Sequence, residues 1–461
     1  MVRGQVNEAA TIMEGRVISG HAEAPWEGAA LDSRRVQGGE LFFALAGERT
    51  DGHQFVSQAL ERGASAAVVS QSVEAPTESG LIEVDDTFAA LHRLTRQVRA
   101  RVPRQLVAVT GSVGKTTTKE ILATLLASRY RVARNPGSLN NLYGFPVALL
   151  GIPEDTEWMV AEMGMSTPGE LGQVSLLGRP DVAVFTNVRP AHLQAFGSLR
   201  AIAEAKAELL QGLAADGLVV ANRDDPEIVR FVGRHQGPLI WFAMQAESDY
   251  GVADIRSRRD GLGTRFRLLA ARQEQEIDLP LHGRYNVENF LAAAACAHAL
   301  GVPLVDIGGA AAGVQGQPMR GTLHRLIGDT VVIDDCYNSN PTALSQALKS
   351  AREVAGQRHW AILGDMLELG ETAPDLHAQA GREAAQMGFS PIVGVGELSR
   401  ELVAGAEETG AETRWYESAR QAAEAVGSDL VDGDVVLVKG SRGVGLEVVV
   451  ESLLATTGEK V

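Results

Sequence analysis

The chain has 461 residues, of which 45% are hydrophobic and 22% charged, and its formal net charge is −16. The composition is typical of globular domains with buried cores, and the length predicts about three domains. The acidic balance argues against nucleic acid or an anionic membrane surface as the main partner.

The two cysteines are too few for a disulfide framework. The longest apolar stretch, residues 291–302, is too short to span a bilayer. The first residues lack the apolar core of a signal peptide. We therefore expect a cytoplasmic protein without membrane insertion or nucleic-acid binding.

Residues 1–103 are predicted to form a smaller N-terminal α/β domain. Apolar runs at residues 41–45, 66–69 and 81–84 predict strands, with helical patterns between them. A charged stretch with a proline at residues 99–104 indicates the boundary.

The stretch TGSVGKTTT, residues 110–118, follows an apolar run and precedes a helical pattern, as a phosphate-binding loop does. Glycines let backbone N–H groups face phosphate oxygens, Lys115 adds a cation and Thr116 a hydroxyl for Mg²⁺. The general motif has a further glycine where this chain has Val109. The competing interpretation is a structural glycine-rich turn. We predict that these residues bind a nucleotide: Thr110, Gly111, Ser112, Val113, Gly114, Lys115, Thr116 and Thr117.

Residues 104–317 are predicted to form a central domain with a doubly wound, largely parallel sheet. Strand-like runs alternate with helical patterns at residues 107–110, 159–162, 182–186, 218–221 and 239–242. Residues 256–279 show shorter alternating runs, which indicate a small antiparallel sheet.

Several polar residues of this domain are candidates for chemistry. Glu162 ends a strand beside the loop strand, where a carboxylate can bind Mg²⁺, although it could be an ordinary strand-end acid. His192 and Lys206 taken alone are typical of surface residues. Asn289 could bind a base edge or simply begin a helix.

Residues 318–461 are predicted to form a second, Rossmann-like α/β domain. Its strand candidates are residues 331–334, 360–363, 392–395, 413–416 and 435–438. The domain has no complete GxGxxG, which argues against a dinucleotide. The loop DDCYNSNP, residues 334–341, offers carboxylates for a ribose and an aromatic ring for a base, or is an Asx-rich turn. The stretch KGSRG, residues 439–443, suits an anionic group or is a basic turn.

These motifs, in this order, resemble the Mur ligase family of peptidoglycan synthesis over nearly the whole chain. TGSVGKTTT is similar to that family's own loop, which also lacks the early glycine. Further matches are GELFFALAGERTDGHQFV, NPGSLNNLYGFP, GRYNVENFLAA, DDCYNSNP and LGDMLELG. Within the family these matches most resemble the branch that adds D-alanyl-D-alanine, and the DNPR-type motif of the branch that adds diaminopimelate or lysine is not found.

The resemblance implies an ATP-dependent, ADP-forming ligase for amide bonds that works through an acyl phosphate. Its implied substrates are UDP-N-acetylmuramoyl-tripeptide (UDP-MurNAc-tripeptide) and D-Ala-D-Ala, its cofactors ATP and Mg²⁺, and its expected state a monomer. The N-terminal domain would bind the UDP substrate, the central domain ATP.

The same resemblance implies roles for individual residues. Lys115, Glu162, His192 and Lys206 would be catalytic, and Thr116, Glu162, His192 and Lys206 would place the metal. Lys206 is similar to a helix lysine that becomes carbamylated in related ligases. Asn289 would contact adenine, Arg320 phosphate and Asp335 the ribose, with Tyr337 beside the nucleotide. Substrate contacts are implied for Ser33, Arg34, Asn140, Asn141, Asn338, Lys439, Ser441 and Arg442.

Three alternatives remain at this point. The chain could be another Mur-type ligase, adding diaminopimelate or lysine or resembling folylpolyglutamate synthetase. Residues 222–225, NRDD, faintly resemble the guanine-reading NKxD of GTPases, with arginine in place of the lysine. A nucleotide-binding scaffold without catalysis is the third.

Overall fold

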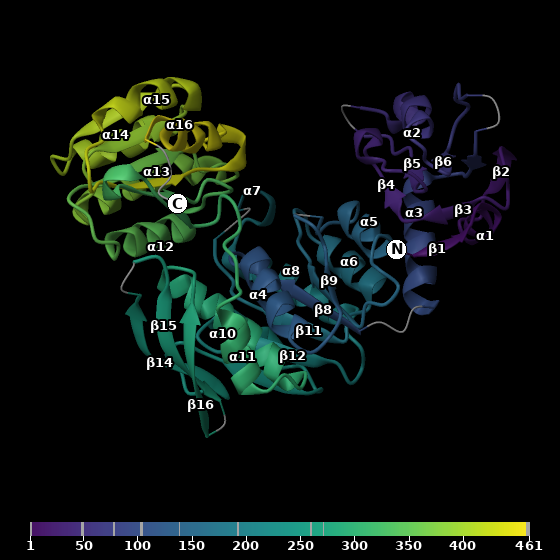
Figure 1. The fold of residues 1–461 in the computed structure, drawn as a ribbon, viewed down its shortest axis with the longest axis horizontal. Helices are drawn as coiled ribbons and strands as arrows, with labels where there is room; N and C mark the ends of the chain where they lie inside the picture. Colours follow the sequence, from purple (N-terminus) through teal and green to yellow (C-terminus); the bar gives the residue numbers. More distant parts are fainter. Residues whose placement is uncertain are drawn as a thin grey trace.

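The structure is a computed structural model that describes residues 2–47, 50–76, 79–101, 105–137, 139–190, 193–258, 261–270 and 272–457. Within these ranges the strands form three larger sheets and one two-stranded pair. Figure 1 shows three successive bodies along the chain, with the N-terminal body (purple) and the C-terminal body (green to yellow) on either side of the central one. The α/β fold with three domains that the sequence predicts is confirmed.

The N-terminal body contains a sheet in the order β2-β7-β6-β5-β4, parallel except for β2. Its strands are β2 (Arg16–Ser19), β4 (Ala29–Ala30), β5 (Leu41–Phe43), β6 (Ala66–Val69) and β7 (Leu81–Glu83), and β1 (Arg3–Gln5) pairs with β3 (Pro25–Glu27). Its helices are α1 (Val6–Ile12), α2 (Val56–Glu61) and α3 (Thr87–Arg101). The three predicted strands are confirmed, whereas β1 to β4 are too short to give a sequence pattern.

The central sheet has the order β16-β15-β14-β13-β12-β11-β8-β10-β9. Its strands are β8 (Gln105–Thr110), β9 (Val132–Arg134), β10 (Trp158–Glu162), β11 (Val182–Phe185), β12 (Leu218–Asn222), β13 (Leu239–Phe242), β14 (Tyr250–Ser257), β15 (Thr264–Ala270) and β16 (Gln273–Leu279). In sheet order, the strands from β14 through β8 to β9 are all parallel. Most of them are buried on both faces, which explains their continuous apolar sequences.

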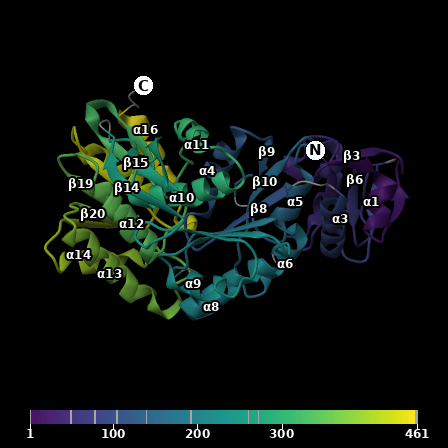
Figure 2. The same cartoon turned by 90° about the horizontal axis from the view of Figure 1, so that it is seen from below.

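Helices cover both faces of the central sheet (Figure 2). One face carries α4 (Lys115–Ala127), α10 (Arg284–Ala299) and α11 (Leu304–Ala311). The opposite face carries α5 (Gly144–Leu150), α6 (Glu170–Gly178), α8 (Leu199–Ala207) and α9 (Pro226–Val232), and α7 (Leu193–Phe196) precedes α8. Apolar residues of α3 share the core of this second face, so the N-terminal body is packed directly on the central one.

The antiparallel strands predicted for residues 256–279 exist, but they do not form a separate sheet. Phe242 of β13 pairs in parallel with Tyr250 of β14, and β15 and β16 follow in antiparallel pairing. The predicted antiparallel pairing is confirmed, whereas the continuation of these strands from the central sheet was not predicted, because hydrogen bonding between strand edges leaves no trace in the pattern of side chains.

The C-terminal body has the sheet order β17-β18-β22-β19-β20-β21, parallel except for β17. The strands are β17 (Thr322–Arg325), β18 (Val331–Asp334), β19 (His359–Gly364), β20 (Ile392–Val395), β21 (Thr413–Tyr416) and β22 (Val435–Lys439). The helices are α12 (Pro341–Arg352), α13 (Ala373–Gln386), α14 (Ser399–Glu407), α15 (Ala419–Val426) and α16 (Glu447–Thr457). The five predicted strands are confirmed, and the half-buried edge strand β17 is an addition.

Two further features of the fold are the burial of the cysteines and the length and apolarity of the helices. Cys296 and Cys336 are both buried and carry free thiols, and Cys296 lies inside α10. In the part of the chain that the structure describes, no helix has the length and apolarity that a membrane span requires.

Candidate active site

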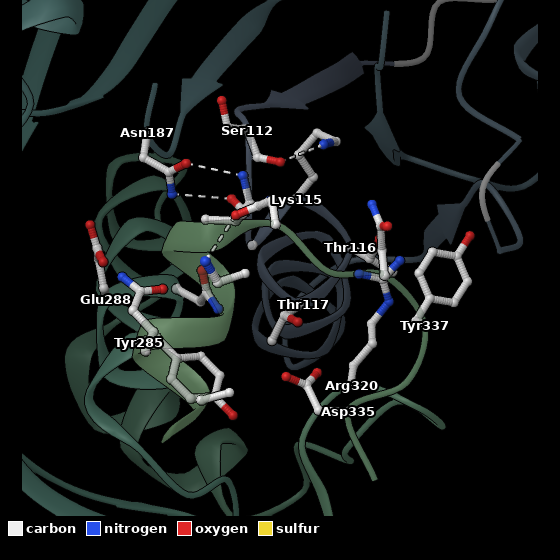
Figure 3. A pocket seen from close by; sticks show the side chains of 18 of the residues that line it. Ser112, Lys115, Thr116, Thr117, Asn187, Tyr285, Glu288, Arg320, Asp335 and Tyr337 are labelled. Atoms are coloured by element: carbon white, nitrogen blue, oxygen red, sulfur yellow. Dashed lines mark hydrogen bonds between the residues drawn. The ribbon is translucent and has the colours of Figure 1, made fainter. Parts of the chain in front are cut away.

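A cavity of about 220 Å³ lies where the central and C-terminal bodies meet. Figure 3 shows the predicted phosphate loop on one side and the polypeptide after β18 on the other. Many of the residues singled out from the sequence line this cavity: Ser112, Val113, Gly114, Lys115, Thr116, Thr117, Asn140, Glu162, Asn289, Arg320, Asp335, Tyr337, Asn338 and Lys439. The predicted loop residues Ser112 to Thr117, the predicted metal residues Thr116 and Glu162, and the predicted ribose residue Asp335 therefore meet in one place, whereas Lys206 is not among the residues that line the cavity.

Lys115 begins α4 immediately after the loop. Its Nζ donates hydrogen bonds to the carbonyl oxygens of Gly111 at 3.0 Å and Ser112 at 3.2 Å. Burial lowers the pKa of Lys115, and the nearby Glu162 carboxylate partly opposes that shift. The ammonium is thus held at the start of a helix, beside the place where phosphate oxygens can meet backbone N–H groups.

Gly114 allows the phosphate loop to pass close to α10. It has φ +80°, and a Cβ at this position would lie 2.1 Å from Oδ1 of Asn289. Any other residue would therefore be strained and would push Asn289 away. The close contact leaves a narrow cradle between the loop and α10, which fits a chain of phosphates.

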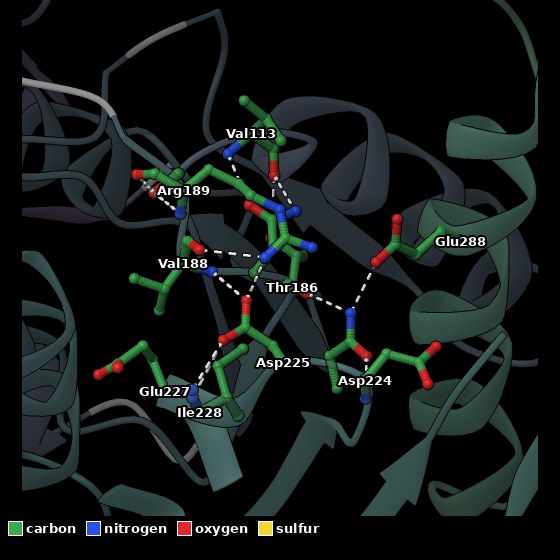
Figure 4. A network of polar contacts seen from close by, with 12 residues as sticks. Val113, Thr186, Val188, Arg189, Asp224, Asp225, Glu227, Ile228 and Glu288 are labelled. Atoms are coloured by element: carbon green, nitrogen blue, oxygen red, sulfur yellow. Dashed lines mark hydrogen bonds and ion pairs between the residues drawn. The ribbon is translucent and has the colours of Figure 1, made fainter. Parts of the chain in front are cut away.

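A second loop, residues 186–189 after β11, braces the phosphate loop (Figure 4). The Asn187 side chain accepts from Val113 N at 3.0 Å and donates to Val113 O at 3.1 Å. Arg189 pairs with Asp225, the buried N-cap of α9, with 2.6 Å between Nη1 and Oδ2. Asn187 lines the cavity and was missed from the sequence, although it follows a strand beside the loop strand.

Glu162 lies at the end of β10, which neighbours β8 in the sheet. The Thr116 hydroxyl donates to Oε2 of Glu162, and Nδ2 of Asn140 donates to Oε1 at 2.7 Å. Asn135 holds the main chain of Glu162, accepting from its N–H at 2.9 Å. A carboxylate and a hydroxyl next to a phosphate cradle are the hard oxygen donors that Mg²⁺ prefers.

The described residues contain no cluster of three or more His, Cys, Asp or Glu that could hold a metal alone. Thr116 and Glu162 would hold a Mg²⁺ ion together with oxygens of a bound nucleotide, as is common for this ion. His192, predicted to be catalytic and a metal ligand, lies outside the described residues.

Lys206 lies in α8 and is only 4% exposed. Burial, together with the positive charge of Lys115 nearby, lowers the pKa of Lys206 well below its ordinary value. A lowered pKa favours the neutral, nucleophilic form of the amine, so the surroundings of Lys206 fit the carbamylation that the sequence resemblance implied.

The C-terminal side of the cavity is formed by the polypeptide after β18 and β22. Nζ of Lys439 lies 2.7 Å from Oδ2 of Asp335 and 2.9 Å from the carbonyl oxygen of Asn338. Burial raises the pKa of Asp335, and Lys439 opposes this shift. The Arg320 guanidinium lies 3.9 Å from the ring centroid of Tyr337, which it stacks on in Figure 3.

Other predicted substrate residues lie away from this cavity or have protein partners. Asn141 Oδ1 accepts from Gly144 N at 2.8 Å and so begins α5. Ser441 Oγ accepts from Leu367 N at 3.0 Å, and Arg442 pairs with Glu447 at 3.2 Å. These contacts give the three residues structural partners, and they do not line the cavity.

Ser33 and Arg34 lie in the N-terminal body. Ser33 Oγ donates to Gln58 Oε1 at 2.6 Å, and Arg34 makes a bidentate contact with Asp32. The hydrogen bond from Arg34 lowers the pKa of Asp32 to about 2. The two residues are therefore held beside the start of α2, in a different body from the nucleotide cradle.

Tyr285 and Glu288 were missed by the sequence reasoning, although they lie in the quoted stretch GRYNVENFLAA. Together with Asn289 they occupy one face of α10 at spacings of three and four residues, and all three line the cavity. Asn222 Nδ2 donates to Glu288 Oε1 at 2.6 Å, and burial raises the pKa of Glu288. Three lining residues contributed by α12 gave no sequence signal: Ala343, Gln346 and Ala347.

Comparisons with known proteins agree with this geometry. Three family models match: the Mur ligase family, catalytic domain at residues 27–99, the Mur ligase middle domain at 109–297 and the Mur ligase, glutamate ligase domain at 319–442. A curated relative from Bacillus subtilis, UDP-N-acetylmuramoyl-tripeptide–D-alanyl-D-alanine ligase, is 33% identical over 98% of this chain and 99% of its own.

Two solved structures extend the similarity to the whole fold. MurF from Acinetobacter baumannii has a TM-score of 0.88 at 28% identity and covers 98% of this chain and 99% of its own. MurF ligase from Thermotoga maritima in complex with ADP has a TM-score of 0.81 at 27% identity, over 93% and 97% of the two chains. The protein whose phosphate cradle, buried lysine and strand-end carboxylate are described above belongs to the Mur ligase family.

Proposed function

We propose that the protein is an ATP-dependent ligase that joins D-alanyl-D-alanine to UDP-MurNAc-tripeptide and forms ADP and phosphate. The observation that carries this proposal is the single cavity shared by the phosphate loop, Glu162 and the C-terminal residues Arg320 and Asp335. Similarity over the full chain to enzymes of that name supports the choice of substrates.

A carboxylate is a poor electrophile, so it must be activated before an amine can attack it. An oxygen of the peptide carboxylate attacks the γ-phosphorus of ATP, and the bond to the bridging oxygen breaks to release ADP. The amine of D-Ala-D-Ala then attacks the acyl carbon, phosphate leaves, and the nitrogen loses a proton. The amide forms without free water competing for the acyl phosphate.

The residues of the phosphate cradle act by electrostatics and position. Lys115 lies where it can exchange its two carbonyl partners for phosphate oxygens. Thr116 and Glu162 would hold Mg²⁺, which supplies charge neutralisation to the transferring phosphoryl group. The neutral Lys206 amine would carry a carbamate, and His192 would complete the metal surroundings.

The remaining roles follow the layout of the three bodies. We assign UDP-substrate binding to residues 1–103 with Ser33 and Arg34, ATP to residues 104–317, and the C-terminal ligase part to residues 318–461. Asn289 would contact adenine and Asp335 the ribose, beside Tyr337. The peptide side would be formed by Asn140, Asn141, Asn338, Lys439, Ser441 and Arg442. The monomeric state and the cytoplasmic location stay predictions, which light scattering and cell fractionation test.

The deciding experiment measures phosphate release with purified UDP-MurNAc-peptides, each with and without D-Ala-D-Ala. We expect release only when ATP, the tripeptide substrate and D-Ala-D-Ala are all present. Release with the dipeptide substrate plus diaminopimelate or lysine, or with a folate and glutamate, would replace the proposal with another ligase activity. Hydrolysis of GTP without any peptide would indicate a GTPase-like protein.

A further inference from the structure

Helix α3 of the N-terminal body contacts the loop that carries Asn140. His92 in α3 is buried, and its Nε2 lies 2.8 Å from the carbonyl oxygen of Leu142, so Nε2 carries the donated hydrogen. Phe88, one turn earlier, packs on the His92 ring with 4.1 Å between centroids and on Tyr143 with 4.9 Å. A hydrogen bond and contacts among three tilted rings therefore join α3 to residues 142–143.

The other end of the same loop holds Glu162. Asn140 Nδ2 donates to Glu162 Oε1 at 2.7 Å, and its carbonyl oxygen accepts from Gly164 N at 2.9 Å. Only Asn141 separates Asn140 from Leu142 in the chain. Because only one residue separates them, a shift of the main chain at Leu142 displaces the main chain at Asn140 and with it the Asn140 amide.

Helix α3 is also fixed at a second point on the central body. Arg99 Nε donates to the carbonyl oxygen of Gly178 at 2.6 Å, and its Nη2 lies 3.2 Å from Asp181 Oδ2. The same Asp181 oxygen accepts from the main-chain N–H of Leu106 in β8 at 2.8 Å. With both attachments and a shared apolar core, α3 is a rigid connection between the N-terminal body and the nucleotide site.

We propose that His92 is a positioning residue: by fixing the main chain at Leu142, it holds the Asn140 amide against the Glu162 carboxylate. The proposal rests on the function proposed above, in which Glu162 helps to bind Mg²⁺. Glu162 keeps one oxygen on Thr116 and the other on Asn140. When the Asn140 bond is lost, the carboxylate is free to rotate away from the metal position. The substrate-binding body would thus influence the catalytic carboxylate through α3.

The test compares three substitutions of His92 in the full chain. Glutamine can place its amide nitrogen near the position of Nε2, whereas asparagine can reach only that of Nδ1, and leucine donates no hydrogen bond. We expect His92→Leu and His92→Asn to lower kcat about tenfold, as loss of a group that orients a metal ligand commonly does, with KM for ATP changed by less than about twofold. His92→Gln should restore most of kcat.

His359 provides a matched control in the C-terminal body. It is also buried, and its Nε2 makes the same kind of contact, 3.0 Å from the carbonyl oxygen of Val354. His359→Leu should lower the melting temperature about as much as His92→Leu but leave kcat unchanged. A second readout is the affinity for Mn²⁺ in the presence of ADP, measured by electron paramagnetic resonance, which should fall only in the His92 variants.

Equal losses of kcat in His92→Leu and His359→Leu, or unchanged kcat and Mn²⁺ affinity in His92→Leu, would overturn the role of His92. If His92→Leu does not fold, equal kcat values for His92→Asn and His92→Gln would likewise overturn the role of His92. Glu162→Gln separates the two proposals. If the Glu162→Gln enzyme is active, the assignment of Glu162 to the metal is rejected. If Glu162→Gln is inactive but His92→Asn is fully active, only the positioning role of His92 is rejected.

Discussion

Nζ of Lys439 lies 2.7 Å from Oδ2 of Asp335, at the ends of two neighbouring parallel strands of the C-terminal sheet. The Lys439 side chain is 3% exposed and that of Asp335 19%. A pair this buried contributes little net stability, but removing one partner leaves the other charge unpaired in the interior.

Lys439→Met should therefore lower the free energy of unfolding by about 3 kcal/mol. Adding Asp335→Leu to that variant should restore much of the loss, since no unpaired charge remains. The double variant should still be inactive, because the proposed ribose contact is gone. Urea denaturation and phosphate release measure the two effects. An active double variant would reject the role of Asp335.

Lys115→Ala should abolish phosphate release while the protein stays folded. The substitution removes the cation that meets the outer phosphates, and Lys115 is a partly buried side chain at the start of a helix. Circular dichroism reports the fold. Lys349→Ala, at an exposed position of α12, serves as the control and should keep full activity. Substantial turnover by Lys115→Ala would reject the assignment of the loop.

Lys206→Ala should lose most activity if a carbamate at this position helps to bind the metal. Added acetate or formate should recover part of the rate in this variant, because a small carboxylate can occupy the space left by the side chain. The lowered pKa of Lys206 favours the neutral amine that reacts with CO₂. Near-normal activity without any added acid would return Lys206 to a purely structural role.

Stability should fall as the pH drops from 7 toward 5. Burial lowers the pKa values of His92, His359 and His377 below the usual 6.5. Each ring is then more readily protonated in the unfolded chain than in the folded one, so acid favours unfolding below pH 6.5. Urea midpoints at several pH values measure this. His359→Gln should show a shallower pH slope than the wild type, and an identical slope would exclude a contribution from His359.

Asn187→Ala should weaken ADP binding about tenfold, because it removes the two side-chain hydrogen bonds from Asn187 to Val113 that help to hold the phosphate loop in shape. Isothermal titration calorimetry measures the affinity. Arg230→Gln, which removes an exposed ion pair on the adjacent helix α9, is the control. Unchanged affinity in Asn187→Ala would show that the loop keeps its conformation without the brace.

The sequence predicted the parts of the fold that local patterns encode. The buried parallel strands gave continuous apolar runs, and the phosphate loop gave its glycines between a strand and a helix. The joining of β14 to the central sheet was not predictable, because it depends on backbone pairing of Tyr250 with Phe242.

At the site, the sequence predicted which residues take part better than it predicted their hydrogen-bond and ion-pair partners. Asn140 was expected near the substrate, but its amide is bonded to Glu162, and Lys439 is bonded to Asp335. Such pairings arise where segments distant in sequence meet. Tyr285 and Glu288 were recoverable in principle, since they share a helical face with Asn289, whereas Gln346 reaches the cavity only through the docking of α12.

The two carbonyl contacts of Lys115 have a consequence for which anions the phosphate loop should bind. Its ammonium is already satisfied by the carbonyl oxygens of Gly111 and Ser112. Chloride or a single orthophosphate would have to replace both of these hydrogen bonds and would form few new contacts with the loop. A polyphosphate brings several oxygens at once and can also meet the α4 N-terminus. We therefore expect the loop to favour ligands that present several oxygens at once over simple anions.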